Sequence, residues 1–324
     1  MSKIYHPDMP VKPFKVFDNE NLTHAKPEKW SEYMAALSDT DIVIVKLGTN
    51  VVTHKVPRRT AHVMHCVAED VTALQQEYGK KVLVVSSGAI GLGRKLRARL
   101  GHKIPKEEKD SAKQKQLDAI YGQDELYRLW MNHFYPAKTS EVLITHQDVR
   151  HKDSMFKRLY QNLDKGVISI VNEDDKRSTE EIEDENRMFW DNDGLESLIS
   201  QGMALDGYKV MSITLTNMPG ICTRKSYRRG QKEVISVVLN SHKLERQVVD
   251  EQSPKGRGGM LTKIMAKRDA AKAGVLGVIA DGMYCDHDGP YQKNSPEATR
   301  NYRVILDIMD GKFVGSWFMP EVSE

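Results

Sequence analysis

The sequence predicts an α/β protein built as a three-layer αβα sandwich, with helices on both faces of a mostly parallel central sheet. Short runs of consecutive apolar residues recur along the chain, as in strands buried on both faces, and stretches with helical spacing separate them. Polar or glycine-rich residues follow several of these runs directly. In a parallel sheet they would meet at the carboxyl edge, where such folds bind ligands.

The apolar runs define the predicted strands in order. These are residues 42–45, 82–85, 167–171, 209–215 and 275–280. Residues 61–78 place apolar side chains at intervals of three and four, which predicts a helix between the first two strands. Residues 301–319 are predicted to form one helix and a final strand. We therefore expect a single domain over residues 41–324.

Residues 1–40 precede this domain and are predicted to form an N-terminal arm. Their prolines and mixed polarity favour an extended segment that packs on the surface or on a partner subunit. They lack the apolar stretch of a signal peptide.

Composition narrows the function classes. The 324 residues are 40% hydrophobic, which is enough for a substantial core, and the net charge of +3 does not indicate nucleic-acid binding. The basic run at residues 94–99 is expected to be a solvated helix face rather than a nucleic-acid patch. Three scattered cysteines without a CxxC pair argue against disulfides or structural zinc and favour the cytoplasm. No apolar run is long enough to predict a membrane helix.

Three segments have the composition of phosphate-binding loops. Lys46 and Gly48 end the first predicted strand, residues 87–93 (SGAIGLG) follow the second, and residues 256–263 (GRGGMLTK) open a helix with Lys263 in its first turn. Glycine backbone, a helix N-terminus and an ammonium group all favour phosphate. Neither a Walker A nor a GxGxxG pattern is present. Taken singly, each segment is also compatible with a solvated lysine, a tight turn or a hinge.

Two carboxylate-rich segments are expected at the same sheet edge. Residues 172–175 (NEDD) follow the third predicted strand, and residues 191–193 (DND) come after a charged stretch. Such carboxylates bind Mg²⁺, orient lysines or accept hydrogen bonds from a substrate amine. The histidines show no metal-ligand spacing, and no GxSxG elbow indicates a hydrolase.

Taken in order, these segments resemble the glutamate 5-kinases of the amino-acid kinase family. The matching motifs are VKLGTNVVT from Val45, VVSSGAIGLG from Val84, KQLDAIYGQ from Lys115, VLIT from Val142, VNEDD from Val171, DND from Asp191, GRGGMLTK from Gly256 and GKFVGSWF from Gly311. The resemblance runs from residue 41 to residue 318. It implies the amino-acid kinase fold and ATP-dependent phosphorylation of the side-chain carboxylate of L-glutamate, the first step of proline biosynthesis. It further implies Mg²⁺ on the nucleotide phosphates and a homo-oligomer.

The resemblance also implies roles for individual residues. Lys46 and Lys263 would contact the ATP phosphates, and Asp193 would hold both lysines in place. The residues expected near the nucleotide are Gly48, Thr216, Asn217, Gly258, Gly259 and Met260. The residues expected to bind the acceptor are Ser87, Gly88, Ala89, Asp175, Asp191 and Asn192. No protein residue is expected to ligate a metal directly.

Several positions depart from the family pattern. Asn217 stands where a strand-end Asp is usual, Asp118 and Tyr121 interrupt a small apolar stretch, and Trp190 replaces a glycine before Asp191. The RNA-binding-like C-terminal domain of many bacterial members is not expected. Two alternatives therefore stay open: a kinase of this fold acting on another small acid, and a catalytically silent nucleotide-binding regulator.

Overall fold

The computed structural model describes residues 15–17, 22–24, 30–54, 57–102, 111–177, 191–224, 228, 234–238, 244, 248, 259–282, 303–312 and 314–320. Within this part of the chain, ten strands form one sheet in the order β2-β1-β8-β10-β9-β7-β3-β4-β6-β5. The strands are β1 (Lys15–Phe17), β2 (Leu22–His24), β3 (Ile42–Leu47), β4 (Lys81–Ser86), β5 (Thr139–Ile144), β6 (Ile168–Glu173), β7 (Val210–Thr216), β8 (Val237–Val238), β9 (Leu276–Asp281) and β10 (Ser316–Phe318). The helices are α1 (Trp30–Ser38), α2 (Thr49–Val52), α3 (Pro57–Gln76), α4 (Ala89–Arg99), α5 (Ala112–Phe134), α6 (His146–Arg150), α7 (Lys152–Asp164), α8 (Asn192–Leu205), α10 (Met260–Lys272) and α11 (Val304–Met309).

The sheet is mostly parallel, as predicted. Strands β9, β7, β3, β4, β6 and β5 all run in the same direction, while β10 is antiparallel to β9 and β2 to β1. All five predicted internal strands are present, and so are the final helix and strand. Strand β5 was not predicted, because this edge strand is only partly buried and begins with three polar residues, so it lacks a long apolar run.

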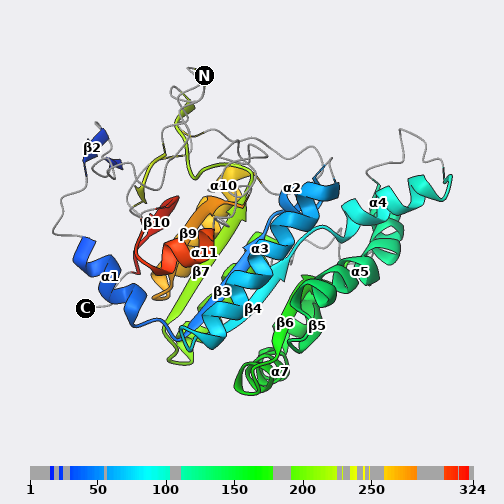
Figure 1. The fold of residues 1–324 in the computed structure, drawn as a ribbon, viewed down its shortest axis with the longest axis horizontal. Coiled ribbons are helices and arrows are strands. Elements are labelled where there is room, and N and C mark those ends of the chain that lie inside the picture. The colour runs from blue at the N-terminus through cyan, green and yellow to red at the C-terminus, as the bar shows by residue number, and fades with distance from the viewer. Residues whose placement is uncertain are drawn as a thin grey trace, which may run out of the picture.

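Alternating side chains of the central strands supply two separate cores, as the period of two in a strand requires. Val43 and Val45 of β3 pack with residues of α3, α5 and α11, whereas Ile42 and Ile44 pack with residues of α7 and α8. Figure 1 shows α3 lying along β3 and β4 on one face. The fold is therefore the predicted αβα sandwich.

The N-terminal arm is only partly extended. Residues 15–17 and 22–24 are strands at the sheet edge, but α1 is a helix whose Tyr33 and Leu37 are buried in the same core as residues of α3 and α11. Tyr33 and Leu37 lie four residues apart, so they share one face of the helix. This spacing explains why the second part of the arm is helical instead of extended.

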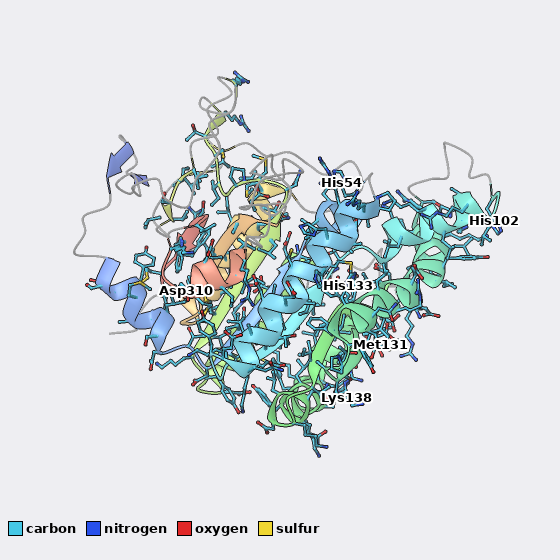
Figure 2. All side chains as sticks on the ribbon, in the orientation of Figure 1. His54, His102, Met131, His133, Lys138 and Asp310 are labelled. Carbon is cyan, nitrogen blue, oxygen red and sulfur yellow. The ribbon has the colours of Figure 1, made fainter. Side chains whose placement is uncertain are left out.

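Helices α4 and α5 pack backbone against backbone and project beyond the sheet (Figure 1). A Cβ atom placed on Gly93 would lie 1.7 Å from the Asp118 carbonyl oxygen, and one on Gly122 would lie 1.9 Å from the Ala89 carbonyl oxygen. Only glycine permits this approach. Figure 2 places His102, just after α4, at the far end of this pair. The contact fixes the start of α4, which follows β4 at the carboxyl edge of the sheet.

No helix in the described ranges has both the length and the apolar character needed to cross a membrane.

Candidate active site

Three predicted residues from distant parts of the chain meet at the carboxyl edge of the sheet. Lys46 near the end of β3 and Lys263 in the first turn of α10 both donate hydrogen bonds to the carboxylate of Asp193, in the first turn of α8. Lys46 Nζ contacts Oδ1, and Lys263 Nζ lies 2.8 Å from Oδ2. One carboxylate thus holds two ammonium groups side by side.

The charges of this trio depend on one another because the side chains are nearly buried. The Lys46 and Asp193 side chains are each 4% exposed and that of Lys263 is 11% exposed. Burial by itself raises the pKa of the Asp193 carboxyl, but the ammonium groups of Lys46 and Lys263 outweigh it and hold this pKa below its ordinary value. With one carboxylate for two ammonium groups, the trio carries a net charge of about +1, which suits an anionic ligand.

Asp191 fixes the start of α8 as its N-cap. Its Oδ1 accepts hydrogen bonds from the backbone N–H groups of Asp193 and Gly194, at 2.9 and 3.0 Å. Burial, and then the charge of Asp193, raise the pKa of the Asp191 carboxyl. Asp191 was predicted to bind the acceptor. In the structure it caps α8 and so helps to position Asp193 in the first turn of that helix.

The end of the glycine-rich segment forms the start of α10, and this helix start positions Lys263. Gly259 is the N-cap, and its carbonyl oxygen accepts from Thr262 Oγ1 at 2.9 Å and from Lys263 Nζ at 3.3 Å. Thr262 Oγ1 also donates to Asp193 Oδ2 at 3.3 Å. Met260 is buried behind this turn. Gly258 lies outside the described residues, so its predicted role stays a prediction.

The other residues predicted near the nucleotide lie at or just after strand ends. The backbone N–H of Gly48 donates to the Leu215 carbonyl oxygen at 3.0 Å, which joins the loop after β3 to the end of β7. Thr216 is buried at that end, and Asn217 is exposed beside it. Asp281, the last residue of β9, is buried and pairs in register with Thr216. This carboxylate was not among the predicted site residues, although its place at a strand end is the signal that would identify it.

The predicted acceptor loop at Ser87, Gly88 and Ala89 lies next to β3. The Ser87 N–H donates to the Leu47 carbonyl oxygen at 3.2 Å. Gly88 has φ of 123°, a conformation that favours glycine, and it caps the N-terminus of α4. The strand-to-helix turn therefore brings backbone N–H groups and the Ser87 hydroxyl to the edge that also carries Lys46.

A hydrogen-bonded chain anchors Asn192 in the predicted acceptor region. Asn192 Nδ2 donates to Asn172 Oδ1 at 2.9 Å, and Asn172 Nδ2 donates to Gln123 Oε1 at 2.7 Å. Gln123 Nε2 in turn donates to Glu141 Oε1 at 2.9 Å. Neither Gln123 nor Glu141 was predicted, and only the Gly-Gln pair in the KQLDAIYGQ motif marked Gln123. Asn172 and Gln123 are buried, so the chain fixes the orientation of the Asn192 side chain from the protein interior.

Two adjacent aspartates after β6 differ in exposure. Asp174 is buried, and its Oδ1 lacks a hydrogen-bond partner, while Asp175 is partly exposed. Asn172 lies in β6, and Asp175, the predicted acceptor ligand, comes two residues after the last residue of that strand. The charged stretch after residue 177 and Trp190 lie outside the described residues.

The basic run in α4 is only partly the solvated face that the sequence suggested, because Arg99 is exposed but Arg97 is buried. Arg94 Nε and Arg97 Nη1 each donate to the Asp118 carboxylate of α5 at 2.8 Å, and Asp118 is fully buried. Arg97 also lies over the ring of Tyr121, with its Cζ atom 5.7 Å from the centroid. The two departures in α5, Asp118 and Tyr121, are therefore partners of arginines in α4. The prediction failed because the partners of these arginines lie on another helix.

The tight α4–α5 contact leads to a prediction about the acceptor loop. Replacing Gly122 by alanine should push Ala89 away, since the new methyl group would lie 1.9 Å from the Ala89 carbonyl oxygen. We expect about 1–3 kcal/mol lower stability and, if the start of α4 binds the acceptor, a roughly tenfold higher acceptor KM. Steady-state kinetics and urea unfolding measure the two effects. Ile120→Ala, at an exposed position of the same helix, is the control. A loss of stability with an unchanged acceptor KM would remove this loop from the acceptor site.

The sequence of this chain matches a known protein family. Residues 41–281 match the model described as the amino acid kinase family. The chain is 31% identical over 287 residues to glutamate 5-kinase of Photobacterium profundum, covering 86% of this chain and 66% of that enzyme. It is 30% identical over 294 residues to glutamate 5-kinase of Shigella flexneri, covering 89% and 71%. The chain thus spans about two thirds of the length of these relatives.

Solved structures agree on the fold. Giardia lamblia carbamate kinase bound to AMP-PNP superposes with a TM-score of 0.54 at 14% identity, covering 88% of this chain and 100% of that one. Isopentenyl phosphate kinase of T. acidophilum gives 0.52 at 14% identity, covering 86% and 99%. At these identities the likeness concerns the fold alone. The match over residues 41–281 shows that this chain belongs to the amino acid kinase family.

Proposed function

We propose that this protein transfers the γ-phosphoryl group of ATP to the side-chain carboxylate of L-glutamate, forming glutamyl 5-phosphate for proline biosynthesis. The observation that carries the proposal is the pairing of Lys46 and Lys263 on Asp193 at the carboxyl edge of the sheet. Phosphoryl transfer needs mainly positioning and charge cancellation around the γ-phosphate. The similarity to glutamate 5-kinases supports glutamate as the acceptor.

In the proposed reaction, a carboxylate oxygen of glutamate forms a bond to the γ-phosphorus while the bond from that phosphorus to the β–γ bridging oxygen breaks, and ADP leaves. The glutamate side chain has an ordinary pKa near 4.3, so the nucleophile is already ionised at neutral pH and no protein base is required. Lys46 and Lys263 would offset charge on the transferring group. Asp175 and Asn192 would orient the amino acid, and Gly48, Gly259 and Thr216 would approach the nucleotide.

Mg²⁺ is proposed to arrive with ATP, on its β- and γ-phosphates. Among the described residues, no three His, Cys, Asp or Glu side chains form a group that could hold a metal ion. Both oxygens of Asp193 accept hydrogen bonds from lysines. These residues fit an ion held chiefly by phosphate oxygens, as is usual for Mg²⁺ in kinases. The bound ion would neutralise charge that develops on the phosphates.

Trapping the acyl phosphate with hydroxylamine tests the function. ADP release from Mg·ATP is measured with and without L-glutamate, and the hydroxamate is quantified. Glutamate-dependent hydroxamate supports the proposal. ATP turnover with another small acid but not with glutamate would favour a different acceptor. ATP binding without any acceptor-dependent ADP would favour a silent regulator, an alternative raised by the exposed Asn217 in place of an aspartate.

The assignment of Asp175 leads to a separate prediction. Asp175→Ala should raise the KM for glutamate about 10- to 100-fold, because a charged hydrogen bond to the substrate ammonium contributes about 1.5–3 kcal/mol. The KM for ATP should change little. Asp269→Asn, at an exposed carboxylate of α10, is the control for loss of one negative charge. An unaltered glutamate KM would show that Asp175 does not bind the acceptor.

A cytoplasmic location and a homo-oligomeric state belong to the same proposal. The absence of a disulfide pattern supports the first, and the family resemblance supports the second. Light scattering coupled to size-exclusion chromatography measures the assembly directly.

A further inference from the structure

A second lysine–carboxylate pair lies directly behind the candidate active site. Lys267 of α10 is fully buried, and its Nζ donates to Glu196 Oε2 of α8 at 3.0 Å. The same ammonium also contacts the Ser212 hydroxyl of β7 and donates to the Ser212 carbonyl oxygen at 3.2 Å. Ser212 Oγ in turn donates to Glu196 Oε1. We call Glu196, Ser212 and Lys267 the buried cluster.

The buried cluster repeats the active-site pair one turn further along both helices. Asp193 and Glu196 are three residues apart on α8, and Lys263 and Lys267 are four residues apart on α10, so each pair of positions shares a helix face. The contacts Asp193–Lys263 and Glu196–Lys267 are therefore successive links between the same two helices. The buried cluster also reaches the sheet, because Ser212 lies on β7 beside β3, the strand that carries Lys46.

Stability alone does not account for charged groups at this place. Burying an ion pair has a large desolvation cost, and apolar side chains of similar size often stabilise a protein as well or better. An ion pair with shared hydrogen bonds differs from apolar packing in being directional. Apolar contacts tolerate small rotations and shifts of one helix on another, whereas the donors and acceptors of the buried cluster are satisfied in one arrangement only.

We infer that Glu196, Ser212 and Lys267 are positioning residues, which fix α10 on α8 and β7 so that Lys263 and Lys46 both reach Asp193. The inference rests on the proposed phosphoryl transfer, in which the two ammonium groups act on the phosphates. A displacement of about 1 Å of a catalytic group lowers turnover by as much as a hundredfold. Small shifts of α10 would therefore reduce catalysis without unfolding the protein.

The decisive variant replaces the whole cluster with apolar side chains of similar size, Glu196→Leu, Ser212→Ala and Lys267→Met together. It leaves no unpaired buried charge, so we expect it to fold with stability equal to or above that of the wild type. We expect kcat to fall about 10- to 100-fold while the KM for the acceptor stays within twofold. Ser200→Ala, at a buried serine of α8 outside the cluster, is the control and should retain full turnover.

A second variant distinguishes an effect on the position of α10 from an effect on the stability of the fold. Lys267→Met alone leaves Glu196 buried without its ammonium partner, and we expect lower stability and lower kcat together. Adding Glu196→Leu and Ser212→Ala should restore the stability but not kcat. If kcat recovers with stability, or if the triple variant turns over like the wild type, the positioning role is wrong and the buried cluster serves stability only.

Binding of AMP-PNP, measured by calorimetry, distinguishes failure of this inference from failure of the proposed function. Wild-type protein that binds AMP-PNP but phosphorylates no acceptor would overturn the proposed function, and with it the catalytic part of this inference. Wild-type protein that is active, together with an equally active triple variant, would overturn the inference alone.

Discussion

Replacing Lys263 by methionine is expected to lower kcat about a thousandfold and to leave the fold intact. The ammonium lies in the first turn of α10 and shares the Asp193 carboxylate with Lys46. A preorganised charge at the transferring phosphoryl group acts mainly in the transition state, and loss of one such group typically costs a factor of about 10²–10³ or more in kcat. Methionine keeps most of the aliphatic volume, and Asp193 keeps Lys46 as its partner, so no buried carboxylate is left unpaired.

Steady-state kinetics in the hydroxylamine assay check this result. Because the interaction is made in the transition state, kcat and kcat/KM should fall by similar factors. Lys272→Met, at an exposed lysine in the last turn of the same helix, should keep normal kinetics. A Lys263→Met protein that turns over normally would show that this lysine does not act on the phosphates.

Replacing Asp193 by asparagine is expected to lower the free energy of unfolding by about 3–5 kcal/mol at pH 7. Removing one partner of a buried ion pair leaves uncompensated charge, and here two nearly buried ammonium groups lose the same carboxylate. Turnover should also fall, since neither lysine keeps its anchor. Urea unfolding gives the stability, and Asp269→Asn is the exposed control.

The stability difference between wild type and Asp193→Asn should depend on pH with a definite sign. The folded-state pKa of Asp193 lies below the ordinary value near 3.9, so its ionised form is stabilising. This contribution is complete above the unfolded pKa and is lost as the pH falls through the folded pKa. The difference should therefore be constant near neutrality and shrink below about pH 4. An equal difference at pH 7 and pH 3 would contradict the assigned charge coupling.

Nucleotide binding provides an independent check of the same coupling. In Asp193→Asn the lysines lack their carboxylate, and the phosphates of AMP-PNP would supply the missing negative charge. We therefore expect AMP-PNP to bind this variant more tightly and, at equal ligand concentration, to raise its melting temperature by more than that of the wild type. A smaller increase would mean that the phosphates bind elsewhere.

Local sequence determined the architecture and the main residues of the candidate site. The apolar run at residues 42–45 has no polar interruption, so a strand buried on both faces is the structure that satisfies it. The polar and glycine-rich segments that follow such strands fall at one edge because parallel strands share a direction. The segments that contain Lys46, Asp193 and Lys263 were expected at this edge, and the resemblance to the glutamate 5-kinases implied that Asp193 holds both lysines; the structure places the three side chains in contact.

Tertiary structure decided which charged residues are buried and with what partner. Arg94, Arg97 and Lys267 resemble ordinary solvated residues in the sequence, yet Arg97 pairs with Asp118 on another helix, and Lys267 pairs with Glu196, 71 residues away. Periodicity reports which face of a helix is apolar, but it carries no information on which distant side chain meets a charge. Burial of an ion depends on its partner, and the partner is fixed only when separate helices and strands pack together.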